Sequence, residues 1–194
     1  MIKEKKTSYK FLSFYLLFCV FTDLVLNKLS FKYFNSEIYS YRLFTIVEFC
    51  TIMFFGSYSI SNKRIKRGIW ILTTLFFSSL IYDIINNNTA DFDSIPTGIE
   101  SLSILIISIL LIYDKISQKN IQNIIDSDVI ISIGFIIFFS GTFFLFILSQ
   151  KYYNNKNFNE AYNLIVASFN TLKNMLITIG LIKYYKLSLL KYKI

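Results

Sequence analysis

Six apolar stretches, each about twenty residues long, account for nearly all of this 194-residue chain. An α-helix rises about 1.5 Å per residue, so a helix of that length crosses a bilayer core about 30 Å thick. In lipid every backbone polar group must be satisfied within the segment, which favours helices. The stretches are Tyr9–Asn27, Tyr41–Ile60, Gly68–Ile85, Ile95–Tyr113, Val129–Ser149 and Ala161–Tyr184. The sequence therefore predicts an all-α, polytopic bundle of six transmembrane helices, with residues 1–194 forming one transmembrane domain.

The composition argues against the other fold classes. The chain is 54% hydrophobic and only 16% charged, with one proline. Helices of a soluble domain would show amphipathic stripes, whereas the runs here are apolar on all sides. The strict alternation of a transmembrane barrel is also absent from the sequence.

The distribution of lysine and arginine predicts the orientation. With six spans, one side of the membrane holds both termini and the second and fourth connectors, and this side carries fourteen of the twenty Lys and Arg residues. By the positive-inside rule both termini face the cytoplasm, which places the protein in the inner membrane. The net charge of +8 then lies against anionic lipid. Because the charges are thinly spread, we expect no nucleic-acid partner.

The tyrosines support the same assignment. Of the fourteen, only Tyr15 lies well within a span, and the others, together with Trp70, fall at or beyond segment ends. Amphipathic rings prefer the headgroup level, so these residues predict aromatic belts at both interfaces. We expect residues 28–40 to lie along the outer interface and residues 116–128 to form a short amphipathic helix on the cytoplasmic surface.

Two charges of opposite sign lie deepest in the predicted spans. Glu48 is almost at the midpoint of the second span, and Lys173 is near the centre of the sixth. A charge at a helix centre costs about 2.5–3.5 kcal/mol on insertion scales, so each should face the protein interior and find a partner. We therefore predict an ion pair between Glu48 and Lys173.

Further polar residues accompany this pair. Asn170 and Asn174 share a side of the sixth helix with Lys173, while Asp23, Asp83 and Glu100 lie toward the outer ends of their spans. One interpretation is a polar cleft, lined by spans two and six, that binds an ion or a ligand. The other is that these groups only lock helices together, with each hydrogen bond worth about 0.6–1.7 kcal/mol, and that Asp23 and Asp83 are simply interfacial. The candidate site residues are Glu48, Lys173, Asn170, Asn174, Glu100, Asp23 and Asp83.

No pattern in the sequence indicates an enzyme. The chain has no histidine and lacks zinc-hydrolase, nucleophile-elbow and phosphate-loop signatures, so we expect no catalytic residue, metal or cofactor. Cys19 and Cys50 lie inside spans and are interpreted as packing residues. Gly134, Ser140 and Gly141 predict a small-residue face for close helix packing.

Four segments of the chain resemble a family of small six-span membrane proteins of the Bacteroidetes. The segments are EIYSYRLFTIVEFCTIMFFGSY (37–58), IPTGIESLSILIISILLIYDKI (95–116), ISIGFIIFFSGTFFLFILS (131–149) and FNTLKNMLITIGLIKYY (169–185). The resemblance implies an architecture and no particular activity. The positions that match the family pattern are Glu48, Glu100, Gly141 and the stripe from Asn170 to Asn174.

Three functions agree with this sequence. The first is a membrane sensor or signalling partner, in which the polar cleft binds a ligand and the basic loops contact a membrane or cytoplasmic protein. The second is an ion channel, pore-forming effector or ion-coupled carrier. The third is a structural subunit of a membrane complex. Beyond the lipid bilayer, the expected partners are such a protein or further copies of the same chain.

Overall fold

The computed structural model describes residues 2–34, 38–86, 94–117, 126–152 and 155–191. Within these ranges every residue is helical except residues 60–62, 126 and 155. The all-α prediction is therefore confirmed for the described part of the chain.

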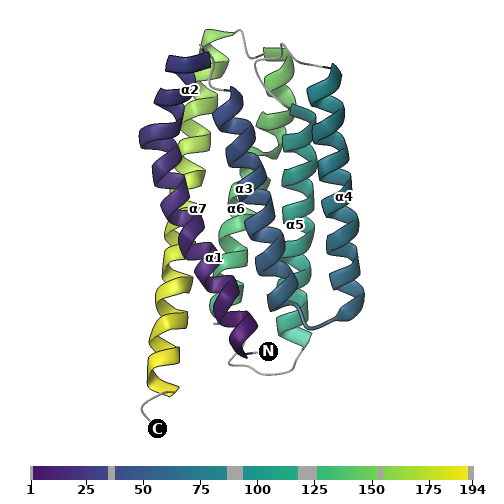
Figure 1. The fold of residues 1–194 in the computed structure, drawn as a ribbon, viewed down its shortest axis with the longest axis vertical. Helices are drawn as coiled ribbons and strands as arrows, with labels where there is room; N and C mark the ends of the chain where they lie inside the picture. Colours follow the sequence, from purple (N-terminus) through teal and green to yellow (C-terminus); the bar gives the residue numbers. More distant parts are fainter. Residues whose placement is uncertain (1, 35–37, 87–93, 118–125, 153–154, 192–194) are drawn as a thin grey trace.

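The long helices follow one another as antiparallel rods, and a short helix continues the first of them (Figure 1). They are α1 (Ile2–Phe21), α2 (Asn27–Phe34), α3 (Ile38–Ser59), α4 (Lys63–Asn86), α5 (Ser94–Ser117), α6 (Ser127–Tyr152) and α7 (Lys156–Lys191), with a π-helical turn, η1 (Thr22–Leu26), between α1 and α2. The start of α1 and the end of α7 lie at the same end of the bundle.

Asn side chains cap the starts of α4 and α7. Asn62 Oδ1 accepts the backbone N–H of Arg64 at 2.9 Å at the start of α4, and Asn155 Oδ1 accepts that of Asn157 at 3.0 Å at the start of α7. Such a cap satisfies one of the backbone donors that the first helical turn leaves free. These polar residues therefore set where the apolar helices begin.

The long helices close into a ring around an apolar core. In this ring α3 packs against α1 and α5, α6 lies between α5 and α7, and α7 returns to α1, while α4 packs against α3 and α5. The core is built from large side chains, including Leu12 of α1, Phe49 of α3, Ile104 of α5, Phe135 of α6 and Ile177 of α7.

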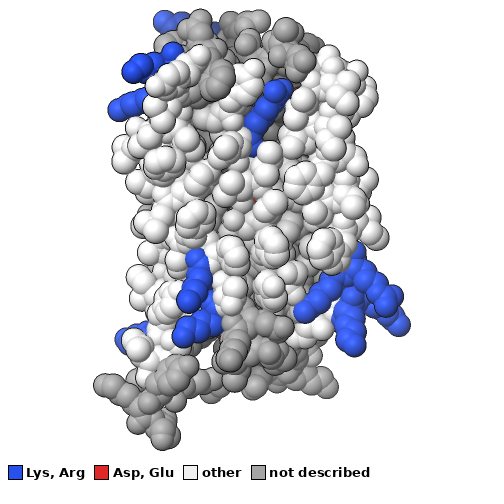
Figure 2. All heavy atoms as spheres, viewed as in Figure 1, with Lys and Arg blue, Asp and Glu red and all other residues white. Residues whose placement is uncertain are grey.

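Five of the described helices are long and apolar enough to cross a membrane. Their candidate spans are Lys6–Leu26, Lys63–Asn86, Ile95–Ser117, Ser127–Leu148 and Lys156–Leu189. Large apolar side chains such as Leu17, Ile85 and Phe144 point outward, as expected of a surface that contacts lipid. On the face seen in Figure 2, Lys and Arg gather at the two ends and leave an uncharged band between them. These features are consistent with a multi-pass integral membrane protein. The helix α3, which carries Arg42 and Glu48, is not among the five.

Two helices extend beyond the membrane spans predicted within them. The helix that holds the first predicted span, Tyr9–Asn27, continues through η1 into α2 and reaches Phe34, while its candidate membrane span is Lys6–Leu26. The last helix has 36 residues, about 54 Å at 1.5 Å per residue, and so exceeds the predicted 161–184 at both ends. Hydropathy marks only the apolar part of a helix, whereas the backbone hydrogen bonds extend into the polar flanks. Residues 118–125 of the predicted amphipathic surface helix lie outside the described residues.

The aromatic residues assigned to the interfacial belts differ in their exposure, and the belts themselves stay a prediction. Trp70, Tyr82 and Tyr113 are exposed. Tyr9 is instead fully buried, because its ring stacks on Tyr184 of α7 with the centroids 3.6 Å apart.

Glycines permit the close approach of α6 and α7. A Cβ atom at Gly134 would lie 3.1 Å from Leu176 Cβ, and one at Gly141 would lie 2.7 Å from the Phe169 ring. The predicted small-residue face is therefore confirmed for Gly134 and Gly141. It is wrong for Ser140, whose side chain is exposed and bonds to a backbone carbonyl of its own helix.

Candidate functional site

Lys173 of α7 and Glu48 of α3 form an ion pair inside the bundle. Lys173 Nζ lies 2.5 Å from Glu48 Oε1, and the two side chains are 0% and 5% exposed. The predicted pair is thus present in the structure. Lys173 reaches Glu48 across the interior of the ring.

Aromatic rings surround the buried ammonium group. Lys173 Nζ lies 3.9 Å from the ring centroid of Phe138, 5.6 Å from that of Tyr15 and 5.8 Å from that of Phe139. The negative face of an aromatic ring attracts a cation, most strongly where water is excluded. The helices α1 and α6 therefore contribute to stabilising a charge that α7 carries.

Tyr15 of α1 completes this central cluster. Its hydroxyl donates a hydrogen bond to Glu48 Oε1, the same oxygen that Lys173 binds. Hydrogen bonds to an ionised group are stronger than neutral ones and orient the carboxylate. Tyr15 was not among the predicted site residues, although its depth in the first span, unlike that of the other tyrosines, was a signal for this role.

Glu100 of α5 is a second buried acid near the pair. It is 2% exposed, and it interacts electrostatically with Glu48 and Lys173. Its Oε1 atom is buried without a hydrogen-bond partner. A buried polar atom without a partner is costly in free energy, so this oxygen requires an explanation.

The other predicted site residues surround this cluster less closely. Asn170 and Asn174 are half-buried, and the Oδ1 atom of each is buried without a hydrogen-bond partner. Asp23 lies in η1 with an exposed side chain, within electrostatic reach of Lys173. Asp83 is buried on α4, which packs against α3 and α5. The structure thus brings Glu48, Lys173 and Glu100 together and adds Tyr15. The polar cleft stays a prediction.

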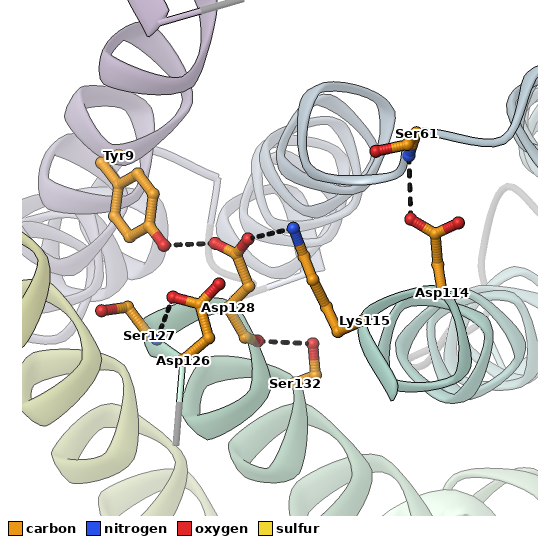
Figure 3. Close-up of polar contacts among 8 residues, drawn as sticks. All are labelled: Tyr9, Ser61, Asp114, Lys115, Asp126, Ser127, Asp128 and Ser132. Carbon is orange, nitrogen blue, oxygen red and sulfur yellow. Dashed lines mark hydrogen bonds and ion pairs between the residues drawn. The ribbon is translucent and has the colours of Figure 1, made fainter. Parts of the chain in front are cut away.

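A second polar cluster, which sequence analysis missed, lies at the end of the bundle where α1 begins (Figure 3). Asp128, in the first turn of α6, accepts a hydrogen bond from the Tyr9 hydroxyl, and its Oδ2 atom lies 3.0 Å from Lys115 Nζ. Beside it, Asp114 Oδ2 accepts the backbone N–H of Ser61 at 2.9 Å. These five residues, the end cluster, connect α1, α5, α6 and the turn between α3 and α4.

The interactions of the end cluster are of the kind that hold helices together. Asp128 is fully buried but has both a cation and a hydroxyl donor, and its place at a helix N-terminus favours a negative charge. Lys115 was assigned to a cytoplasmic connector, yet it is buried. The available signal was that polar residues border both ends of the same connector, at 114–115 and 126–128.

Comparisons of the chain with protein-family models, with curated proteins and with solved structures find no match. The resemblance to the Bacteroidetes family therefore stays a prediction, and the function is argued from the geometry of the site.

Proposed function

We propose that the chain is a six-span protein of the inner membrane, with both termini in the cytoplasm, and that it carries out proton-coupled transport. The proton-binding site is the central cluster of Glu48, Lys173, Tyr15 and Glu100. The observation that carries this proposal is that two buried carboxyl groups act on one buried ammonium group.

The sixth span in this proposal is α3. It has 22 residues, about 33 Å at 1.5 Å per residue, and runs alongside the other long helices (Figure 1). Its deepest charge, Glu48, faces the protein interior and is paired, so the charge is not exposed to lipid. A span at this position places the two termini on the same side, in agreement with the distribution of Lys and Arg.

The charge balance of the cluster supports proton binding. If Glu48 and Glu100 were both ionised, Lys173 would neutralise only one of them, and an uncompensated charge would remain in a low-dielectric interior. Such a charge costs several kcal/mol. A bound proton removes this cost, and its uptake and release give the site a chemical function.

The same observation separates proton coupling from the other two hypotheses. A structural subunit that only fixes helix register needs one acid and one base, and Glu48 with Lys173 would be sufficient. A sensor needs a ligand or a protein partner, whereas the extra acid requires only a proton. The unbalanced carboxyl group therefore favours the ion-coupled alternative.

The experiment is proton flux through purified protein in liposomes under an imposed membrane potential. We expect flux in the wild type and at least a tenfold decrease in Glu48→Gln. In that variant one carboxyl group remains for Lys173, so the cluster no longer takes up and releases a proton. The matched control is Glu160→Gln, which removes an exposed carboxyl group 4.0 Å from Lys156 and should leave the flux unchanged. Flux that is absent from the folded wild type, or equal in Glu48→Gln, would overturn the proposal.

A further inference from the structure

The two acids of the central cluster differ in their hydrogen bonds. Glu48 Oε1 accepts two donors, the Tyr15 hydroxyl and the Lys173 ammonium. Glu100 Oε1 has none, although Glu100 is 2% exposed. The neighbouring hydroxyl of Ser101 does not serve it, because that group donates to the Thr97 carbonyl at 2.8 Å. Two donors therefore bind Glu48 Oε1, whereas Glu100 Oε1 has no hydrogen bond.

Charged groups from α3 and α7 act on Glu100. From α3, Glu48 acts on Glu100, and Glu100 acts on the Cys50 thiol. From α7, Lys173 acts on it. The helix α4 carries Asp83 and the exposed Tyr82, and residues 129–148 of α6 contain no titratable group. Among the described residues, Lys173 is the cation shown to act on Glu100.

A proton suits this site better than a metal cation does. A dehydrated hard cation takes six or more oxygen ligands, whereas a proton needs one oxygen. Within the described residues no group of three His, Cys, Asp or Glu side chains is arranged to hold a metal ion.

From these observations we propose that Glu100 holds the proton in this conformation, and that Lys173 changes its partner from Glu48 to Glu100 when the proton moves. In the transfer, the O–H bond of Glu100 breaks, and an O–H bond forms on a Glu48 oxygen. The negative charge passes from Glu48 to Glu100, and the ammonium of Lys173 keeps its own protons and follows the charge on its flexible four-carbon chain. This inference rests on the proposed proton binding and specifies which residue binds.

The test is infrared spectroscopy of the purified protein in lipid nanodiscs at neutral pH. A protonated carboxyl group has a C=O stretching band that a carboxylate lacks. We expect this band in the wild type, with a shift when glutamate is labelled with ¹³C at its side-chain carboxyl. The band should disappear in Glu100→Gln and remain in the matched control Glu160→Gln. Where Glu100→Gln does not fold, Glu100→Asp should abolish the sensitivity of the band to labelled glutamate.

Two further variants test whether Lys173 changes its partner from Glu48 to Glu100. In Glu48→Gln, Lys173 is free to pair with Glu100, so the band should disappear although Glu100 is intact. In Lys173→Met both acids lose their cation, and the band should increase. A wild type without the band, or a band that is lost in Asp83→Asn and kept in Glu100→Gln, would overturn the assignment of the proton. A band that persists in Glu48→Gln would overturn the exchange. The spectra require no transport, so failure of this inference can be distinguished from failure of the flux experiment.

Discussion

Side chains from four helices hold the buried charges of the central cluster. Tyr15 comes from α1, Glu48 from α3, Phe138 from α6 and Lys173 from α7. Replacing a buried ion pair with apolar groups can be neutral, but removing one partner leaves the other charge buried and uncompensated. The pair should therefore behave as a unit when it is mutated.

At the residue scale this unit predicts strong coupling between two substitutions. Lys173→Met should lower the free energy of unfolding by about 3–5 kcal/mol, because it leaves the buried Glu48 without a cation. Glu48→Gln should lower it by less, because Lys173 can then pair with Glu100. The double variant should be destabilised by much less than the sum. Reversible unfolding in mixed micelles would give the free energies of the wild type, the two single variants and the double variant, which together form a double-mutant cycle. Additive losses would show that the two side chains do not stabilise each other.

The helices α6 and α7 depend on backbone proximity that only glycine allows. At Gly180 of α7 a Cβ atom would lie 2.5 Å from Ile131 Cγ1 and 3.1 Å from the Ser127 carbonyl oxygen. The Ile131 side chain could rotate, but the backbone of α6 could not yield without moving the helix. A Cβ atom added at Gly68 of α4 would meet no neighbouring heavy atom within 4 Å. The two glycines therefore form a matched pair for testing helix contact.

At the element scale we expect opposite effects of the same substitution. Gly180→Ala should lower the free energy of unfolding by about 1–3 kcal/mol, because the added methyl group overpacks the contact between α6 and α7. Gly68→Ala should raise it by up to about 1 kcal/mol, because alanine favours the helix and meets no neighbour. The same unfolding assay would measure both variants. Equal stability of the two would contradict the close approach of these helices.

At the scale of the whole molecule, the bundle places its polar groups at defined depths. The central cluster lies inside the ring of helices, the end cluster lies where α1 begins, and basic side chains gather at both ends of the face seen in Figure 2. The even number of membrane crossings in the proposed topology returns α7 to the side from which α1 starts. The ends of the bundle should therefore differ in their accessibility in the cell.

This topology can be measured with single cysteines in a chain that carries Cys19→Ala and Cys50→Ala. Arg64→Cys reports on the start of α4, and Asn157→Cys reports on the start of α7, both at exposed positions. A membrane-impermeant maleimide should label Asn157→Cys in intact spheroplasts and Arg64→Cys in inside-out vesicles. The reverse pattern would place the termini outside the cytoplasm, and labelling of both in spheroplasts would contradict a span between them.

The sequence by itself determined the helices and the depths of their charges. Apolar runs of about twenty residues permit only helices in lipid, and a buried charge must find a partner, so the pairing of Glu48 with Lys173 followed from depth and sign. The same reasoning located Gly134 and Gly141 on one packing face.

Only the tertiary structure decided which side chains meet. In a soluble helix the apolar stripe shows which face is buried, but in a membrane helix the lipid face and the core face are both apolar, so hydropathy does not set the rotation of a helix about its axis. The contact of Tyr15 with Glu48, the cation over Phe138 and the burial of Asp128 against Lys115 all depend on that rotation. The approach of Glu100 to the central pair depends in addition on which helices are neighbours, since α5 packs against α3. Neighbours in the ring are chosen by side-chain packing between segments far apart in the sequence, and no local pattern records that choice.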